Sequence, residues 1–242
     1  MTGSRGFVGG RVSKLLQANK IKVIKTTRKK FKGFKFINWN SNQYLEKLCK
    51  NKNVIINCAG LDVHQSKNKK KAYKVNAEYP LKLYKAANKC NVDLFIFLST
   101  YHVYDLEKNG KIDENKKLKK KDNYSASKIL GEKKLISIKN KKTKLLIIRP
   151  CNLFGYPVYK TKNCWKLVIN SILKQVTLNK KYIINSEKNN YRNYSSVKNF
   201  CLFLLNLIRK IKKMKFKNNI FIINYTSNKN LNLIDLAKVI RE

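Results

Sequence analysis

The sequence predicts an α/β fold in which helices cover both faces of a doubly wound parallel sheet. Two observations carry this prediction. Short apolar segments alternate with helical ones along the first 150 residues, and four of the nine glycines fall within the first ten. Apolar residues make up 43% of the 242-residue chain, which is enough for a packed core although 28% of its residues are charged. A folded, Rossmann-like domain is therefore expected rather than a disordered chain.

The first 150 residues supply strands and helices in alternation. Residues 93–100 are nearly all apolar, which is typical of a strand covered on both faces. Residues 105–123 are polar and charged, which indicates a surface loop. Strands are expected at residues 21–27, 34–39, 53–60, 93–100 and 143–150, and helices over residues 7–16, 44–48, 73–90 and 124–138.

The alternation loosens beyond Pro150, which indicates a second, smaller region. We expect a Rossmann domain over residues 1–149. Residues 150–242 would form an incomplete substrate-binding lobe, some elements of which pack back on the Rossmann domain. In this second part we expect a loop at 152–165, a helix at 166–177, a short strand at 182–185, a helix at 196–213, a strand at 220–225 and a last helix from residue 232.

The net charge of +42 is the most unusual property of the composition. The lysines are spread along the chain, and Lys, Asn and Ile are abundant together, so a bias toward A/T-rich codons explains the charge better than a dedicated nucleic-acid surface. We expect no specific nucleic-acid partner. The charge still favours anionic ligands such as nucleotides, with salt-sensitive binding.

Cysteine usage and hydropathy predict a cytoplasmic protein. None of the six cysteines forms a Cys-x-x-Cys pair or has metal-ligand spacing to a histidine, so free thiols and no metal site are expected. No N-terminal signal sequence is visible. The longest apolar run, Phe200–Ile208, is too short to span a bilayer, so we expect no membrane association.

The opening stretch MTGSRGFVGG predicts a loop that binds the phosphates of a dinucleotide. Gly3, Gly6 and Gly9 have the spacing Gly-x-x-Gly-x-x-Gly before a helix, where glycine permits a tight turn and close approach of a pyrophosphate to the backbone. Such a loop normally follows a buried strand, and none precedes Met1. We therefore expect about five to seven residues of apolar strand, a usual strand length, to belong upstream of Met1.

The end of the next predicted strand bears on the choice of cofactor. A carboxylate there would bind the ribose hydroxyl of NAD, but this chain has Thr26, Thr27 and Arg28. Arg28 is able to pair with a 2′-phosphate. The sequence therefore favours NADP slightly over NAD.

Tyr124 and Lys128 are the candidate proton-transfer pair. Residues four apart share a helix face, and a nearby Lys lowers the pKa of a Tyr, which can then exchange a proton with a sugar or alcohol oxygen. Four other Tyr–Lys pairs in the chain have this spacing, but only Tyr124 opens a helix between two core strands. The preceding strand ends in Ser99 and Thr100, whose hydroxyls would lie at the ligand-binding edge of the sheet.

Together these features resemble the extended short-chain dehydrogenase/reductases, the NAD-dependent epimerase/dehydratase family that acts on nucleotide sugars. The resemblance covers essentially the whole chain. Its Arg-Asp-Phe/Tyr motif is matched by Arg192–Val197 with Asn193 in place of the Asp. The other matching motifs are Thr2–Gly9, Asn57–Gly60, Asn76, the set Thr100, Tyr124 and Lys128, Arg149–Gly155 and residues 222–240.

The resemblance implies a role for each group of residues. Tyr124 would be the acid/base, Lys128 would tune it and hold the nicotinamide ribose, and Thr100 would orient a sugar oxygen. His102, Asn152 and Arg192 would contact the nucleotide-diphosphate sugar. The implied cofactor-binding residues are Gly3, Arg5, Gly6, Phe7, Gly9, Arg28, Cys58, Ala59, Gly60, Asn76 and Lys128.

The resemblance also implies a homodimer and a place in the biosynthesis of surface-polysaccharide precursors. Tyr101 and His102 replace the Asp-Glu pair of the 4,6-dehydratases, so we expect a reductase or an epimerase. Two alternatives remain open: a non-catalytic module that binds a dinucleotide or nucleic acid, and an inactive fragment.

Overall fold

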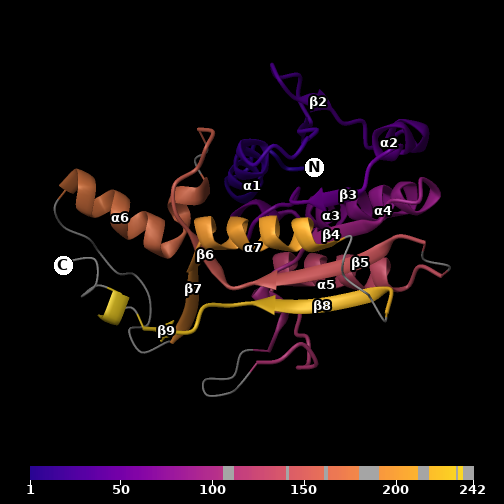
Figure 1. Cartoon of the computed structure of the whole chain (residues 1–242). Helices are drawn as coiled ribbons and strands as arrows, with labels where there is room; N and C mark the ends of the chain where they lie inside the picture. The colour runs from indigo at the N-terminus through magenta and orange to yellow at the C-terminus, as the bar shows by residue number, and fades with distance from the viewer. Residues whose placement is uncertain are drawn as a thin grey trace.

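A parallel four-stranded sheet forms the centre of the molecule. The computed structural model describes residues 1–105, 112–139, 142–160, 163–179, 191–211, 218–232 and 234–236. The central sheet has the order β3-β4-β5-β8 (Figure 1). Its strands are β3 (Val54–Asn57), β4 (Leu94–Leu98), β5 (Lys144–Pro150) and β8 (Ile220–Tyr225), all of them parallel.

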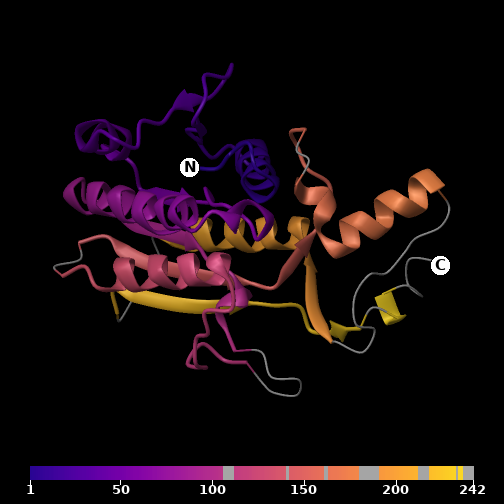
Figure 2. The same ribbon diagram turned by 180° about the vertical axis from the view of Figure 1, so that it is seen from behind.

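Helices cover both faces of this sheet, as the sequence predicts. Alternate strand residues point to opposite faces. Phe95 and Phe97 pack under α2 (Asn42–Cys49), α4 (Tyr79–Lys89) and α5 (Asn123–Ile136). Leu94 and Ile96 pack under α1 (Phe7–Ala18) and α7 (Val197–Lys210). Helix α7 lies in front of the sheet in Figure 1, and α4 and α5 lie in front in the reverse view of Figure 2.

The N-terminus lies between the central sheet and a second pair of strands. β1 (Thr26–Thr27) and β2 (Lys35–Phe36) are parallel to each other. The amide of Thr2 donates to the carbonyl of Ile56 at 2.9 Å, and the amide of Thr26 donates to the carbonyl of Met1 at 3.0 Å. Met1 and Thr2 therefore occupy the place between β1 and β3 that the first strand holds in this topology.

The two predicted strands at residues 21–27 and 34–39 are much shorter than expected. Only Thr26–Thr27 and Lys35–Phe36 are paired as strands. Thr2 makes a single bridge, to Asn57, and the amino group of Met1 donates to the carbonyl of Ile24 at 2.9 Å, so the described chain pairs with residues 21–24 at one backbone group and forms no ladder there. An apolar segment becomes a strand only where another backbone satisfies its hydrogen bonds.

The second lobe is built around a small three-stranded sheet of order β6-β7-β9. Its strands are β6 (Asn152–Phe154), β7 (Arg192–Ser196) and β9 (Asn230–Leu231), and α6 (Val168–Asn179) packs against it through Ile169 and Ile172. In Figure 1 this lobe lies beyond the arrowheads of β5 and β8, at the carboxyl edge of the central sheet.

Several predictions for the second lobe need correction. The loop expected at residues 152–165 contains β6 and the short 3₁₀ helix η4 (Asn163–Lys166), and β7 was not anticipated as a strand. The predicted strand at residues 182–185 lies outside the described residues, as does most of the helix from residue 232. The division of the chain at residue 149 stays a proposal.

Candidate active site

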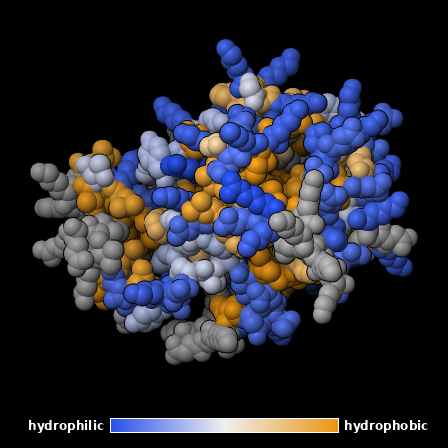
Figure 3. All heavy atoms as spheres, in the orientation of Figure 1, coloured by the Kyte–Doolittle hydropathy of each residue, from blue (hydrophilic) through white to orange (hydrophobic). Residues whose placement is uncertain are grey.

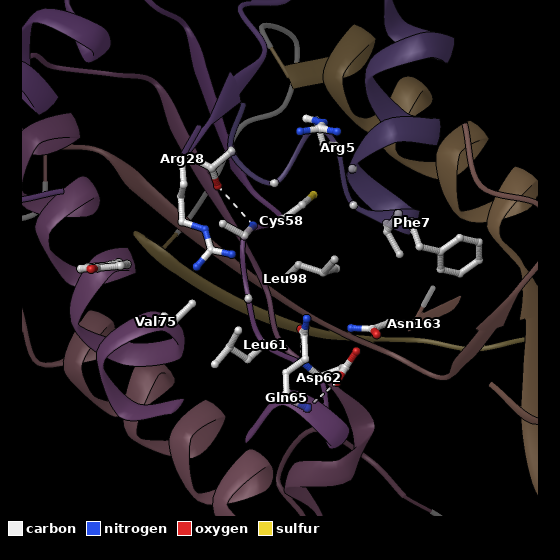
Figure 4. A pocket seen from close by; sticks show the side chains of 18 of the residues that line it. Arg5, Phe7, Arg28, Cys58, Leu61, Asp62, Gln65, Val75, Leu98 and Asn163 are labelled. Atoms are coloured by element: carbon white, nitrogen blue, oxygen red, sulfur yellow. Dashed lines mark hydrogen bonds between the residues drawn. The ribbon is translucent and has the colours of Figure 1, made fainter. Parts of the chain in front are cut away.

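A cleft of about 750 Å³ opens at the carboxyl edge of the central sheet, beside the glycine loop (Figure 4). This volume is in the range of ligand pockets. Figure 4 shows Arg5, Arg28 and Cys58 toward one end of the cleft and Asp62 and Gln65 toward the other. The predicted site residues that line it are Gly3, Arg5, Gly6, Phe7, Gly9, Arg28, Cys58, Ala59, Gly60, Tyr124 and Lys128.

The glycine loop packs against the segment after β3 so closely that side chains are excluded. Gly3 has φ +67°, and a Cβ on it would stand 2.6 Å from the carbonyl oxygen of Cys58. A Cβ on Gly9 would stand 2.3 Å from the carbonyl oxygen of Gly3. Two of the three glycines are therefore needed for the approach of one backbone to another.

The N-terminus of α1 is open to an anion. Gly6 is exposed and precedes the helix, and no side chain in the described part of the chain caps it. The first-turn residues Phe7, Val8 and Gly9 line the cleft. Uncapped amides at a helix N-terminus, together with the helix dipole, bind phosphate.

The segment Asn57–Gly60 lies directly beside the glycine loop, and its residues Cys58, Ala59 and Gly60 line the cleft. The hydroxyl of Thr2 donates to Asn57 Oδ1 at 2.6 Å and accepts from the amide of Ala59 at 3.2 Å. Thr2 therefore joins the start of the glycine loop to this segment by its side chain as well as by its backbone.

Asn76 supports the cleft from behind and does not line it. Its side chain is fully buried. Its Oδ1 accepts from the amide of Leu61 at 2.7 Å, and its Nδ2 donates to Ser127 Oγ at 2.9 Å. Asn76 thus connects the wall after β3 to α5, and it is placed there by the single π-helical turn Lys74–Glu78 that precedes α4.

Tyr124 and Lys128 face the cleft from the first turns of α5. A capping box fixes the start of this helix, because the Asp122 side chain accepts from the amide of Ser125 at 2.7 Å and Ser125 Oγ accepts from the amide of Asp122 at 3.0 Å. Thr100 follows the end of β4. The structure thus brings the three predicted catalytic residues to one place from two neighbouring elements.

Lys128 is almost completely buried, with 5% of its surface exposed. Its Nζ donates to the carbonyl of Leu98 at 2.9 Å and lies beside Gly60, where an added Cβ would stand 3.1 Å away. Burial lowers the pKa of Lys128 to about 8, against the opposing charges of Cys58 and Glu132.

The pKa of Tyr124 differs from the prediction made from the sequence, in which the nearby Lys128 lowers it. Burial raises the pKa of Tyr124 to about 12, while a hydrogen bond with Thr100 acts in the opposite direction. Burial is the largest influence on this pKa, and the ammonium group of Lys128 donates to the carbonyl of Leu98. At neutral pH Tyr124 is a phenol, able to donate a proton to an oxygen of a ligand.

The predicted substrate residues form a separate cluster between Thr100 and the second lobe, outside the lining of the cleft. The hydroxyl of Tyr101 donates to Asn152 Oδ1 at 3.0 Å, and Asn152 Nδ2 donates to the carbonyl of Asn193 at 3.1 Å. The ring of His102 lies 5.9 Å from that of Tyr124. Burial lowers the pKa of His102 to about 4, Asp122 opposes this shift and the charge of Arg192 adds to it.

A buried ion pair lies behind the predicted catalytic residues, and the sequence did not predict it. Arg149 and Glu132 are 2.6 Å apart, and both are buried. Ser99 Oγ also donates to Glu132, and Arg149 donates to the hydroxyl of Tyr104 at 2.7 Å. One signal was present, since Glu132 follows Lys128 by four residues and so shares its helix face.

The residues present fit a dinucleotide. The backbone approach at Gly3 and Gly9 and the uncapped first turn of α1 suit a pyrophosphate. Arg5 Nε is buried with no hydrogen-bond partner among the described residues, so a donor stands ready beside the loop. When bound, a nicotinamide cofactor supplies hydride transfer, and the protein supplies binding and orientation.

The fold and the cleft define a Rossmann-type dinucleotide-binding protein. The model of the NAD dependent epimerase/dehydratase family matches residues 1–223, so the chain belongs to this family of enzymes and uses a nicotinamide dinucleotide. A comparison with curated proteins finds no match.

Several solved structures share the fold. MoeE5 in complex with UDP-glucose and NAD has a TM-score of 0.80 at 15% identity, over 99% of this chain and 79% of that one. UDP-N-acetylglucosamine 4-epimerase from Bacillus cereus has 0.78 at 20%, over 98% and 80%. A dTDP-4-dehydrorhamnose reductase from Clostridium acetobutylicum has 0.75 at 20%, over 99% and 77%. At these identities the likeness establishes the fold.

Proposed function

We propose that this enzyme is an NAD(P)-dependent epimerase or reductase of nucleotide-diphosphate sugars, with Thr100, Tyr124 and Lys128 as its catalytic set. The observation that carries the proposal is the position of Tyr124 and Lys128 in the wall of a cleft whose other wall is an open glycine loop. The solved structures that share the fold include enzymes with such substrates. Nucleotide sugars are activated precursors, and we place the activity in the supply of surface polysaccharides.

Each member of the set has a task that its surroundings support. Tyr124, protonated at neutral pH, would donate its proton to a keto oxygen of the sugar, or accept one in the reverse direction. Thr100 would orient the same oxygen through its hydroxyl. Lys128 would hold the nicotinamide ribose by hydrogen bonds from a largely buried ammonium group. His102, neutral at pH 7, would contact the sugar from the far side of Tyr124.

The end of the cleft next to β1 supports a preference for NADP over NAD. Arg28 and Lys29 line it directly after β1, and Arg5 lines it from the glycine loop. Residues 26–29 contain no carboxylate to accept a hydrogen bond from a ribose hydroxyl. Three cations without a carboxylate suit a 2′-phosphate.

Two measurements on the purified chain test this proposal. Titration with NADPH and NADH should show saturable binding, tighter for NADPH. With a panel of nucleotide sugars, the variant Tyr124→Phe should lose about 10²- to 10⁴-fold in turnover, the usual contribution of a general acid, while its cofactor affinity stays unchanged. Unaltered turnover in Tyr124→Phe would contradict the catalytic set. Gel filtration would test the expected homodimer.

A further inference from the structure

The segment that follows β6 packs against the glycine loop and the start of α1 through an aromatic side chain, Tyr159. Tyr159 rests on Gly10, the fourth glycine of the opening motif, where an added Cβ would stand 3.2 Å from Cδ2 of the Tyr159 ring. One residue along α1, Arg11 donates from Nε to the carbonyl of Tyr156. The absence of a side chain at Gly10 therefore makes room for Tyr159 of the segment after β6. Contact with the cofactor does not explain this glycine.

Tyr159 also contacts the turn between β1 and β2. Its ring lies edge-on to Phe34, with centroids 5.4 Å apart and planes at 71°. Phe34 in turn lies edge-on to Phe31 at 5.4 Å. Gly33, with φ +77°, permits the tight turn that presents both Phe rings, and the amide of Phe34 closes that turn on the carbonyl of Phe31 at 3.1 Å.

The far end of this aromatic row holds Arg5. The guanidinium carbon of Arg5 lies 3.9 Å from the centroid of the Phe31 ring. The face of a phenyl ring attracts the cation, but it offers no oxygen or nitrogen atom to accept a hydrogen bond from the guanidinium N–H groups. Arg5 Nε accordingly has no hydrogen-bond partner among the described residues, and Arg5 lines the cleft beside the glycine loop. The contact with Phe31 thus holds Arg5 beside the glycine loop, with a buried Nε that has no partner among the described residues.

The row connects two segments whose neighbouring residues line the cleft, although the three rings are not themselves part of the lining. Phe31 and Phe34 follow Arg28 and Lys29, which line one side. Tyr159 precedes Asn163, Cys164 and Leu167, which also line it and belong to the segment after β6. Figure 4 shows Arg5, Arg28 and Asn163 around the same opening. The contact between Phe34 and Tyr159 thus joins two chain segments that enclose the cleft.

We propose that Phe31, Phe34 and Tyr159 form an aromatic clasp that holds Arg5 against the phosphates of the cofactor and slows cofactor release. The clasp rests on the proposed function, because it needs a bound dinucleotide. These are positioning residues, which act through Arg5 and through the enclosure of the cleft. Breaking the clasp should therefore alter the lifetime of the cofactor complex and leave the chemistry at Tyr124 intact.

The test is the rate at which bound NADPH is displaced, followed by stopped-flow fluorescence. Tyr159→Ala and Phe34→Ala should each release NADPH about threefold to tenfold faster, the range that an aromatic pair accounts for. Phe36→Ala is the matched control. Phe36 is 43% exposed and only two residues from Phe34, and its ring has no aromatic contact within the described chain.

Gly10 offers a second, independent test. Gly10→Ala should accelerate release as well, because its methyl group pushes Tyr159 aside. In the Tyr159→Ala background the same substitution should add nothing, since the space is then free, and this non-additivity is the signature of the contact. Thermal unfolding should confirm that each variant is folded. If Tyr159→Ala does not fold, Phe34→Ala still tests the contact, because Phe34 lies on an exposed turn.

The outcomes separate the clasp from the proposed function. If the wild type binds NADPH and both ring deletions release it at the wild-type rate, the clasp is wrong while the cofactor assignment stands. If the wild type binds neither NADPH nor NADH, both proposals fail. Faster release with unchanged single-turnover chemistry supports the clasp.

Discussion

At the scale of single residues, burial sets the protonation states of this site more than charge does. Lys128 and Tyr124 both shift in the direction that disfavours their charged forms, and His102 does the same. The site therefore holds a neutral His and a protonated Tyr at pH 7. Lys128, with its pKa of about 8, is the group that titrates just above neutrality.

We expect cofactor affinity to fall as the pH passes about 8. Below that pH Lys128 carries a charge that attracts the cofactor, and above it the charge is lost. The dissociation constant should rise by at most about tenfold per pH unit, the limit for one proton. The Met1 amino group and the Cys58 thiol lie on either side of this pH, with pKa values of about 6 and about 12.

Fluorescence titration with NADH between pH 7 and pH 10 measures this effect. The variant Lys128→Met should bind more weakly at pH 7 and with little dependence on pH, whereas Tyr124→Phe should keep the wild-type profile. A Lys128→Met variant with the wild-type profile would assign the titration to another group.

At the scale of elements, α5 is the helix on which the site depends. Its first turn is held by Asp122 and Ser125, and one turn beyond Lys128 it is held by Glu132. Arg149 of β5 and Ser99 after β4 both bind Glu132. The same carboxylate thus ties α5 to the two strands beneath it and sets the position of Lys128 relative to Thr100.

Glu132→Gln should destabilise the protein by about 3–5 kcal/mol, because it leaves the charge of Arg149 buried without its partner. Chemical denaturation by urea measures the change in the free energy of unfolding. The double variant Glu132→Leu/Arg149→Met should regain part of the loss, since no buried charge remains. Glu46→Gln, which breaks the exposed pair with Lys89, is the control and should have little effect. Equal unfolding midpoints for wild type and Glu132→Gln would refute this role.

The sequence predicted the elements that depend on local pattern and missed those that depend on distant partners. The apolar run at residues 93–100 and the helix from Tyr124 are where they were expected, so the region of the site follows from chain order. The strands β6 and β7 pair across about forty residues of chain, and with three and five residues they are too short to show a strand periodicity. The contact of Tyr159 with Gly10 joins residues 149 positions apart and leaves no sequence signal.

At the scale of the whole molecule, positive charge greatly exceeds negative charge. The chain has 55 Lys and Arg against 13 Asp and Glu, and the described residues form three ion pairs. Figure 3 shows hydrophilic residues over most of one face, with apolar atoms gathered over α6. None of the helices in the described segments combines the length and the apolar character needed to cross a membrane.

This charge should act on ligands from a distance, and salt should reveal it. Raising the ionic strength from about 0.05 M to about 0.5 M shortens the screening length to a few ångströms and removes the long-range attraction. We expect the KM of the nucleotide sugar and the dissociation constants of both cofactors to rise, with kcat nearly constant, because the contacts inside the cleft remain. NADPH carries the larger negative charge, so its dissociation constant should rise more steeply with salt than that of NADH. A parallel decline of kcat, or equal slopes for the two cofactors, would show that salt acts on the fold or on the local contacts instead of on the field of the whole protein.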